Sequence, residues 1–379
     1  MEVTRVEPIV LESSIGTVSI PGGKSDFETT VRPVIAKVHT DEGITGIGET
    51  FLDDPSGDSS RSAAAGIQAL GNHLIGKDPR NVTELWNEMY VHVKRGVKGY
   101  RPMSALDEAL WDIVGKDAGK PLYQLLGGKA GELEAYATFP LPKETDELIE
   151  DAKWLDEKGF PLMKIIAGHG VKKDRKRIET LAEELPEDFG LAIDANTSYQ
   201  IPDALAVAEI ASEHDLEWFE EPIEHTDIDG QANLNRRTSV PISGFQTHHT
   251  QYAAIEHLQK DALEIYQPAL DLNGGITPAN RVATLVEAFN KEFLPHAYGP
   301  MINYAASLHV AAASPVCNLI EFAVYSDDVE DPGEYLASPY IANQEDVYVQ
   351  DGGVIEPPEK PGLGVELDGD VVEEYRVDW

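Results

Sequence analysis

The chain has 379 residues, of which 42% are hydrophobic, and 67 acidic against 30 basic side chains give a formal net charge of −37. This composition is typical of a globular protein, and the length suits two domains. The acidic residues are spread along the whole chain, and concentrated salt would screen their repulsion, which indicates a salt-adapted protein with a solvated acidic surface. Nucleic acid and anionic membranes are excluded as preferred partners, because binding either requires a basic face.

Neither export nor membrane insertion is indicated. The first ten residues lack the basic region and apolar stretch of a signal peptide. No apolar run approaches the roughly 18 residues that a transmembrane helix needs. The single cysteine, Cys317, excludes an internal disulfide and is expected to be a buried thiol. We therefore predict a cytoplasmic protein.

In chain order, the first 50 residues are predicted to be rich in strands. Apolar and alternating runs cover residues 4–14 and 32–50, and the second is divided by the turn signal Asp41-Glu42-Gly43. The segment between them, residues 14–27, is rich in Gly and Ser and is predicted to be a loop. From Ser59 to about Gly128, apolar residues recur at helical spacing. Residues 1–128 are therefore predicted to form an N-terminal α+β domain.

After Gly128, short apolar runs alternate with amphipathic stretches. This alternation predicts parallel βαβ units, and eight such units close into an α/β barrel. We assign residues 129–349 to this barrel, and we expect the strand-like residues 350–379 to pack back on the N-terminal domain. The eight predicted strands are residues 133–139, 160–166, 189–195, 216–221, 240–246, 264–270, 292–297 and 317–322.

Polar residues occur at or near the C-terminal ends of six of these strands, most of them one βα unit apart. Barrel enzymes place their chemistry at these strand ends, so residues distant in sequence should converge there. The six residues are Lys164, Asp194, Glu220, Gln246, His296 and Glu321.

Three of them are candidate metal ligands. Asp194, Glu220 and Gln246 offer two carboxylates and one amide oxygen, a set that suits Mg²⁺. The alternative is that they are ordinary surface residues of an acidic protein. Asn196 and Glu221 adjoin this set, and strand alternation should turn Glu221 away from the metal into a supporting position.

The other three are candidate catalytic residues. Lys164 lies among apolar neighbours, which indicates a base, a group that polarises a substrate carboxylate, or a salt bridge to a barrel acid. His296 is the candidate general acid–base. Glu321, if protonated, would hydrogen-bond a developing enolate; otherwise it is a surface acid. His169, His248 and His249 follow strand ends and are either substrate contacts or ordinary loop histidines.

Several segments resemble the mandelate racemase and muconate lactonizing enzyme branch of the enolase superfamily. The segment DEALWDIVGKDAGKPLYQLLGG at 107–128 is similar to the family's hallmark segment before the barrel. AIDANTSY and WFEEP resemble the segments that carry the first two metal ligands, Asp194 and Glu220. Later segments, including FLPHAYGP and PGLGVEL, extend the similarity over nearly the whole chain.

The resemblance implies a capping α+β domain over a modified (β/α)7β barrel. It also implies that Mg²⁺ binds a substrate carboxylate and stabilises an enediolate after a lysine or histidine takes the α-proton. Loops of the capping domain near residues 14–30 and 50–60 would select the substrate, and relatives commonly form symmetric homo-oligomers.

Three positions depart from the family pattern. The family's second strand usually ends in Lys-x-Lys, and here Ile166 replaces the second lysine. Gln246 stands where a third carboxylate ligand is usual, and Ala269 replaces the aspartate that orients the histidine. Asp271 would take over that role if the strand continued to it.

These losses favour one class of reaction. Racemisation needs a base on both faces of the α-carbon, whereas dehydration can be served by a single histidine. We therefore predict dehydration of a sugar acid to a 2-keto-3-deoxy acid. The alternatives are a racemase, epimerase or cycloisomerase that uses Lys164 and His296, and a non-catalytic carboxylate-binding protein.

Overall fold

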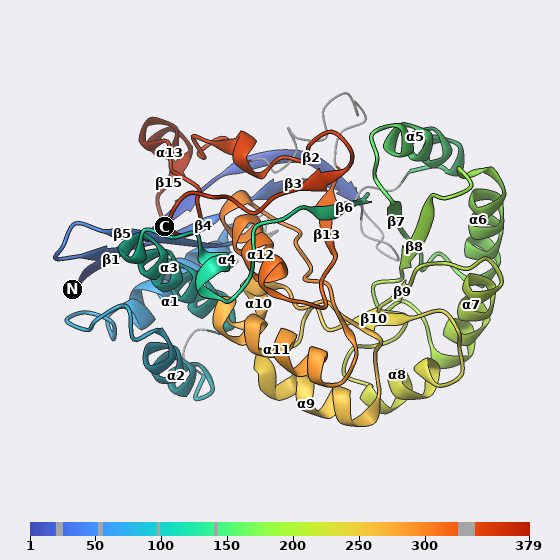
Figure 1. Ribbon diagram of the computed structural model, residues 1–379, viewed down its shortest axis with the longest axis horizontal. Coiled ribbons are helices and arrows are strands. Elements are labelled where there is room, and N and C mark those ends of the chain that lie inside the picture. The colour runs from blue at the N-terminus through green and yellow to red at the C-terminus, as the bar shows by residue number, and fades with distance from the viewer. Residues whose placement is uncertain (20–25, 52–55, 97–98, 140–142, 325–337) are drawn as a thin grey trace.

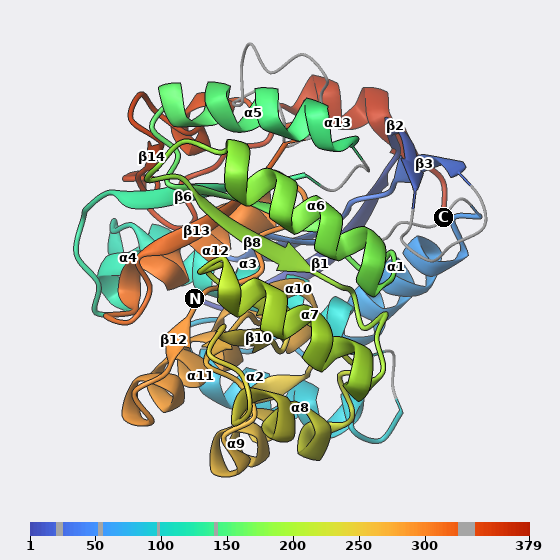
Figure 2. The ribbon, with the colours of Figure 1, turned by 90° about the vertical axis from the view of Figure 1, so that its right-hand side faces the viewer.

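The computed structural model describes residues 1–19, 26–51, 56–96, 99–139, 143–324 and 338–379. Figure 1 shows two parts, a small antiparallel sheet with helices near the N-terminus and a larger ring of strands surrounded by helices. In the second view, helices α5 (Thr145–Glu157) and α6 (Val171–Glu184) lie side by side on the outside of that ring (Figure 2). Within the described ranges, no helix is both long enough and apolar enough to cross a bilayer.

The N-terminal sheet has the strand order β15-β1-β4-β5, with all neighbours antiparallel. The turn signal at Gly43 is used as expected, because φ is 84° there and glycine adopts that conformation without strain. Gly48 lets β5 lie directly on a helix, since a Cβ at this position would collide with the carbonyl of Ala105. The elements are β1 (Val3–Leu11), β4 (Val34–Thr40), β5 (Thr45–Thr50), β15 (Arg376–Val377), α1 (Asp58–Gly71), α2 (Val82–Val93) and α3 (Tyr100–Ala118).

The Gly/Ser-rich segment predicted to be a loop instead forms an antiparallel pair, so that prediction is wrong. Strands β2 (Ser13–Ser19) and β3 (Asp26–Val31) pair with each other, and residues 20–25 lie outside the described residues. The sequence here contains β-branched residues, including Val18 and Thr29, which favour extended backbone. Their strand propensity outweighs the glycines and serines.

The eight predicted barrel strands are all present, and the predicted fold class is confirmed. They lie in the order β12-β11-β10-β9-β8-β7-β6-β13, and neighbouring strands in this order are parallel. Phe293 N of β12 donates a hydrogen bond at 3.1 Å to the carbonyl of Val316, which precedes β13. The strands are β6 (Leu133–Thr138), β7 (Leu162–Ile166), β8 (Gly190–Asp194), β9 (Phe219–Glu220), β10 (Ile242–Gly244), β11 (Ile265–Tyr266), β12 (Glu292–Phe293) and β13 (Leu319–Ala323).

Helices connect most of these strands and cover the outside of the ring. The remaining helices are α4 (Leu122–Leu125), α7 (Ile201–Glu213), α8 (Ile228–Asn235), α9 (Thr250–Lys260), α10 (Leu270–Asn273), α11 (Ile276–Ala288), α12 (Met301–Ala313) and α13 (Gly369–Tyr375).

The C-terminal segment contacts both parts of the molecule. Strand β14 (Val354–Ile355) pairs antiparallel with β6 of the barrel, and β15 pairs with β1 of the N-terminal sheet. The last residues of the chain therefore lie beside its first strand.

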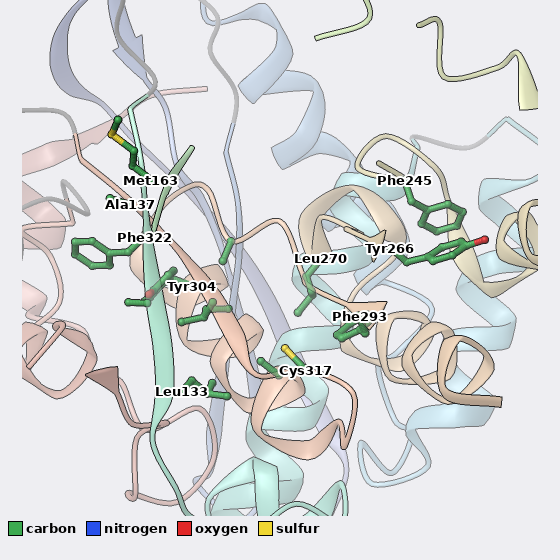
Figure 3. Packing of buried hydrophobic residues seen from close by; sticks show 14 of the residues in the cluster. Leu133, Ala137, Met163, Phe245, Tyr266, Leu270, Phe293, Tyr304, Cys317 and Phe322 are labelled. Atoms are coloured by element: carbon green, nitrogen blue, oxygen red, sulfur yellow. The ribbon is translucent and has the colours of Figure 1, made fainter. Parts of the chain in front are cut away.

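Two apolar layers form the barrel core. A large cluster lies between strands and helices, and Figure 3 shows Ala137 and Phe322 on one side of it and Tyr266 and Phe293 on the other. Cys317 is buried in this cluster, as predicted, and burial raises the pKa of its thiol to about 12. A second layer fills the inside of the ring with one residue from each of several strands, namely Tyr136, Leu162, Ala192, Trp218, Ile265 and Leu294.

Buried acids on or beside α3 join the N-terminal part to the barrel, and we call Glu49, Asp107, Glu108 and Asp112 the seam acids. Asp107 accepts hydrogen bonds from the backbone N–H and the hydroxyl of Thr277, each at 2.8 Å. Asp112 accepts from Ile47 N and Leu363 N, each at 2.9 Å. Backbone donors from distant segments therefore satisfy these carboxylates.

Glu49 makes the same kind of contact at the start of α12. Its carboxylate accepts from Ile302 N at 3.0 Å and from the Tyr340 hydroxyl at 2.5 Å. Its own N–H donates to Glu108 at 2.8 Å. A helix N-terminus favours an acceptor at this place because its first N–H groups lack partners within the helix.

Candidate active site

A group of polar side chains lies directly above the inner apolar layer. Side chains alternate along a strand, so the residue two positions after each inner residue also faces the inside of the ring. The residues two positions after the six inner-layer residues are Thr138, Lys164, Asp194, Glu220, Gln267 and His296. Glu321 of β13 joins them, since it contacts both Lys164 and Thr138.

Lys164 is at the centre of this group and is 3% exposed. Its ammonium lies 2.9 Å from both carboxylate oxygens of Glu220 and 2.9 Å from Oε1 of Glu321. Burial alone would lower the pKa of Lys164, but the two carboxylates outweigh it and hold that pKa well above its ordinary value. Lys164 is therefore a buried ammonium paired with barrel acids.

Glu321 is buried and ionised. Thr138 Oγ1 donates to its Oε1 at 2.8 Å, and Ala297 N donates to its Oε2 at 3.1 Å. Burial would raise the pKa of this carboxyl, but Lys164 and His296 lower it to about 2. The prediction of a protonated Glu321 that donates to an enolate does not fit this environment.

His296 follows β12, and its Nε2 lies 3.9 Å from Oε2 of Glu321. Its Nδ1 is buried and has no hydrogen-bond partner among the described residues. Ala269 and His296 form an isolated parallel bridge, so they lie side by side. Ala269 offers the histidine only a methyl group. Glu321 therefore forms the ion-pair contact of this imidazole.

Asp271 does not continue the strand, so the expectation that it would share a strand face with His296 is wrong. It lies in the short helix α10, and its buried carboxylate pairs with Arg101 of α3. Burial raises the pKa of Asp271, while Arg101 and His296 lower it, so it contributes to the field at the histidine without touching it. The strand β11 ends at Tyr266 and the helix begins at Leu270, so Asp271 has helical and not extended backbone.

Asp194 and Glu220 are neighbours in the paired strands β8 and β9. Burial and the charge of Glu220 raise the pKa of Asp194 well above its ordinary value. Glu220 Oε2 also accepts from Trp218 Nε1 at 3.1 Å and from Gln267 Nε2 at 2.8 Å. Two carboxylates held this close favour a bound cation between them.

Gln246 follows β10 at a sharp turn. The preceding residue, Phe245, has a φ of 90°, a conformation that glycine adopts more readily, and its ring packs against Tyr266 and His257. Strand alternation therefore ends at Gly244. Gln246 comes next and is partly buried.

Comparison with known families assigns the whole architecture. The family described as "Enolase C-terminal domain-like" matches residues 147–371, and the family "Mandelate racemase / muconate lactonizing enzyme, N-terminal domain" matches residues 26–127. The chain belongs to the mandelate racemase and muconate lactonizing enzyme branch of the enolase superfamily. The resemblance inferred from the sequence is thus confirmed.

Similar proteins cover the full length of this superfamily member. D-galactarolactone cycloisomerase of Agrobacterium fabrum is 31% identical, over 100% of this chain and 99% of its own length. Arabinonate dehydratase of Saccharolobus solfataricus is 30% identical, over 90% of each chain.

Solved structures agree with this assignment. The 3,6-anhydro-D-galactonate cycloisomerase from Zobellia galactanivorans superposes with a TM-score of 0.84 at 29% identity, over 100% of both chains. A racemase from Streptomyces coelicolor A3(2) with bound magnesium has a TM-score of 0.84 at 25% identity, over 99% of this chain and 100% of its own.

The residues next to the candidate ligands of this enolase-superfamily site have defined contacts. Asn196 donates its backbone N–H to Asp194 Oδ1 at 2.8 Å. Glu221 has a φ of 39°, is 7% exposed, and its Oε1 has no hydrogen-bond partner among the described residues. Burial and the charge of Glu220 raise the pKa of Glu221 to about 7.

The three loop histidines do not converge on Lys164. His248 stacks on Phe245 and contacts the carbonyl of His225 at 3.1 Å, and burial lowers its pKa to about 3. His249 stacks on Tyr100 at a centroid distance of 4.1 Å. His169 lines a separate cavity beside α6.

Sequence reasoning missed two polar residues of the site. Gln267 is fully buried, binds Glu220, and leaves its Oε1 without a partner among the described residues. Thr138 binds Glu321. The signal for Gln267 was available, because it is a polar residue in an apolar strand, as Lys164 is.

Proposed function

We propose that this protein is a lyase that removes the α-proton of a sugar-acid carboxylate and expels the β-hydroxyl as water, which yields a 2-keto-3-deoxy acid. The proposal rests on one observation: among the strand ends that carry the candidate site, only one side offers a residue that can transfer a proton. His296 stands on one side, and strand β7 presents Ile166, which has no titratable group, at its end.

The donor set fits Mg²⁺. No three His, Cys, Asp or Glu side chains converge as metal ligands in the described part of the chain, so the amide of Gln246 would complete the set of Asp194 and Glu220. The like-charged pair of Asp194 and Glu220, with the raised pKa of Asp194, supports a cation there. When bound, the ion would supply positive charge that makes the α-proton of the substrate carboxylate more acidic.

The chain's own residues account for the remaining steps. The Lys164 ammonium would supply positive charge close to a substrate carboxylate, because Glu220 and Glu321 keep it protonated. His296 takes the α-proton, and the adjacent carboxylate of Glu321 stabilises the resulting imidazolium. The same imidazolium then gives a proton to the departing β-oxygen, so one histidine serves both proton transfers.

The same geometry supports a second candidate. In a cycloisomerisation, the β-oxygen that departs from carbon belongs to a ring and stays in the molecule, so the product is an isomer of the substrate. The full-length similarity to two cycloisomerases favours this variant. Both reactions need the same base and differ only in the leaving group.

The test is a screen of the purified protein with Mg²⁺ in concentrated KCl against a library of sugar acids and their lactones. Mass spectrometry separates loss of water from isomerisation, and the 2-keto-3-deoxy product is measured colorimetrically. We expect dehydration that is lost in Asp194→Asn and His296→Asn and kept in His73→Asn, an exposed histidine of the N-terminal part.

Three other results would contradict the proposal. An isomeric product would identify a cycloisomerase. Exchange of the α-proton with solvent deuterium, without loss of water, would identify a racemase or epimerase. Tight binding of an acid without exchange or turnover would identify a carboxylate-binding protein.

A further inference from the structure

A cavity of about 430 Å³ lies beside the barrel mouth, where the start of α5 meets α6. Its volume is in the range of small-ligand pockets. Basic side chains and hydroxyls contribute much of its lining, including Lys143, Thr145, His169, Lys173, Lys176 and Arg177. This site is separate from the Lys164 group, which does not line it.

The charge of this cavity is opposite to that of the protein. The chain carries −37 overall, yet residues 172–177 contain five Lys and Arg side chains. Helical spacing brings Lys173, Lys176 and Arg177 to one face of α6, the face that lines the cavity. Two acids, Glu144 and Asp146, also line it, and they are exposed, as Lys173 and Lys176 are.

Arg177 is fixed in place by backbone carbonyl groups. Its two terminal nitrogens donate to the carbonyls of Ile166 at 3.0 Å and Lys143 at 2.9 Å. Its Nε is buried and has no hydrogen-bond partner among the described residues. Carbonyl groups orient the guanidinium, while the carboxylates of Asp174 and Glu144 act on its charge without a hydrogen bond or ion pair to it among the described residues; burial still lowers the pKa of Arg177.

The lysines of the same face are also unneutralised. Neither Lys173 nor Lys176 forms an ion pair with another residue in the described ranges. Lys143, by contrast, pairs with Asp151 at 2.8 Å. Three cations therefore line a ligand-sized space without forming an ion pair with a protein acid in the described ranges, and the exposed acids Glu144 and Asp146 line the same space.

We infer that this cavity binds a small multivalent oxyanion of the phosphate or polycarboxylate class. Arg177 would donate from its fixed guanidinium, the two lysines would supply charge, and the Thr145 hydroxyl would donate a further hydrogen bond. Because Arg177 also holds the carbonyl of Ile166, the anion would bind next to the end of β7. It is either a free ion or the distal anionic end of a substrate.

Calorimetric titration of the full chain with inorganic phosphate and with citrate, in EDTA and at constant ionic strength, tests this inference. We expect binding to the wild-type protein and at least about tenfold weaker binding to the Lys173→Ala/Lys176→Ala variant, equivalent to about 1.4 kcal/mol. The control is Lys172→Ala/Arg175→Ala, which removes the same charge from positions of α6 that do not line the cavity and should change affinity less than about twofold.

Absence of binding by both anions, or equal weakening in the two variants, would overturn the inference. The source of the anion is decided by comparing a dicarboxylic with a monocarboxylic sugar acid in the presence of Mg²⁺. Tighter binding of the dicarboxylic acid, lost in Lys173→Ala/Lys176→Ala, assigns the cavity to a substrate end. Equal binding of the two acids, with phosphate not competing, assigns it to a free ion. These readouts need no turnover, so their failure is distinct from failure of the proposed reaction.

Discussion

The molecule buries two sets of carboxylates in different ways. The seam acids, Glu49, Asp107, Glu108 and Asp112, are held mainly by backbone N–H groups that come from other segments. The mouth acids, Asp194, Glu220 and Glu321, lie instead around the single cation of Lys164 and beside one another. Fixed amide donors suit a permanent joint, whereas closely spaced like charges leave a need for a cation or a substrate.

The largest expected effect separates catalysis from stability. His296→Asn should lower kcat by about 10²- to 10⁴-fold, since it removes the proposed general acid–base. Its free energy of unfolding should change little, because the Nδ1 of His296 has no partner to lose among the described residues. Steady-state rates and urea unfolding of the same preparation measure both quantities. A large loss of stability would place His296 among the structural residues.

The next effect is on stability at the mouth. Lys164→Met leaves Glu220 and Glu321 buried without their cation, and we expect it to cost about 3–5 kcal/mol in the free energy of unfolding. Addition of Mg²⁺ should restore part of this loss. Lys116→Met is the matched change at the seam and should cost less, because Asp112 keeps two backbone donors. Equal losses in urea titrations would remove the distinction between the two sets.

Substitution of a seam acid should lower stability and leave the catalytic rate almost unchanged. Asp107→Ala removes the acceptor for the Thr277 N–H and hydroxyl and should cost about 1–3 kcal/mol of stability. The rate per folded molecule should stay within about twofold, and Asp107→Asn should be milder because it keeps an acceptor. A rate loss in Asp107→Ala that exceeds its loss of folded protein would show that the seam acts on catalysis.

The last effect is a dependence of stability on pH. Burial raises the pKa of Glu49 from 4.5 to about 7, so the folded chain binds a proton between these values that the unfolded chain releases. Stability from this group is therefore present at low pH and is lost as pH rises from about 4.5 through 7. Glu49→Gln should remove up to about 1.4 kcal/mol per pH unit of that slope. Urea unfolding at several pH values measures it, and an unchanged slope would contradict the assignment.

Much of the fold and part of the site were predictable from local pattern. Apolar runs between amphipathic stretches located all eight barrel strands, and polar residues within those runs identified Lys164 and Glu321, which the structure brings together. The same signal applied to Gln267, which directly follows β11 and lies in the predicted strand 264–270, but it was overlooked. The prediction of a loop in the Gly/Ser-rich segment was wrong, because part of this segment pairs as the strands β2 and β3.

The sequence by itself determined the family, through the segments that resemble it, and the order of the barrel strands along the chain, which follows from the alternation of apolar runs and amphipathic stretches. Only the tertiary structure decided what the residues of the candidate site contact. The turns at Leu270 and Phe245 end strand alternation, so Asp271 pairs with Arg101 instead of His296. The ionised state of Glu321 depends on Lys164, which lies 157 positions away in the chain and 2.9 Å away in space. Burial and long-range charge set such properties, and neither is written in the local sequence.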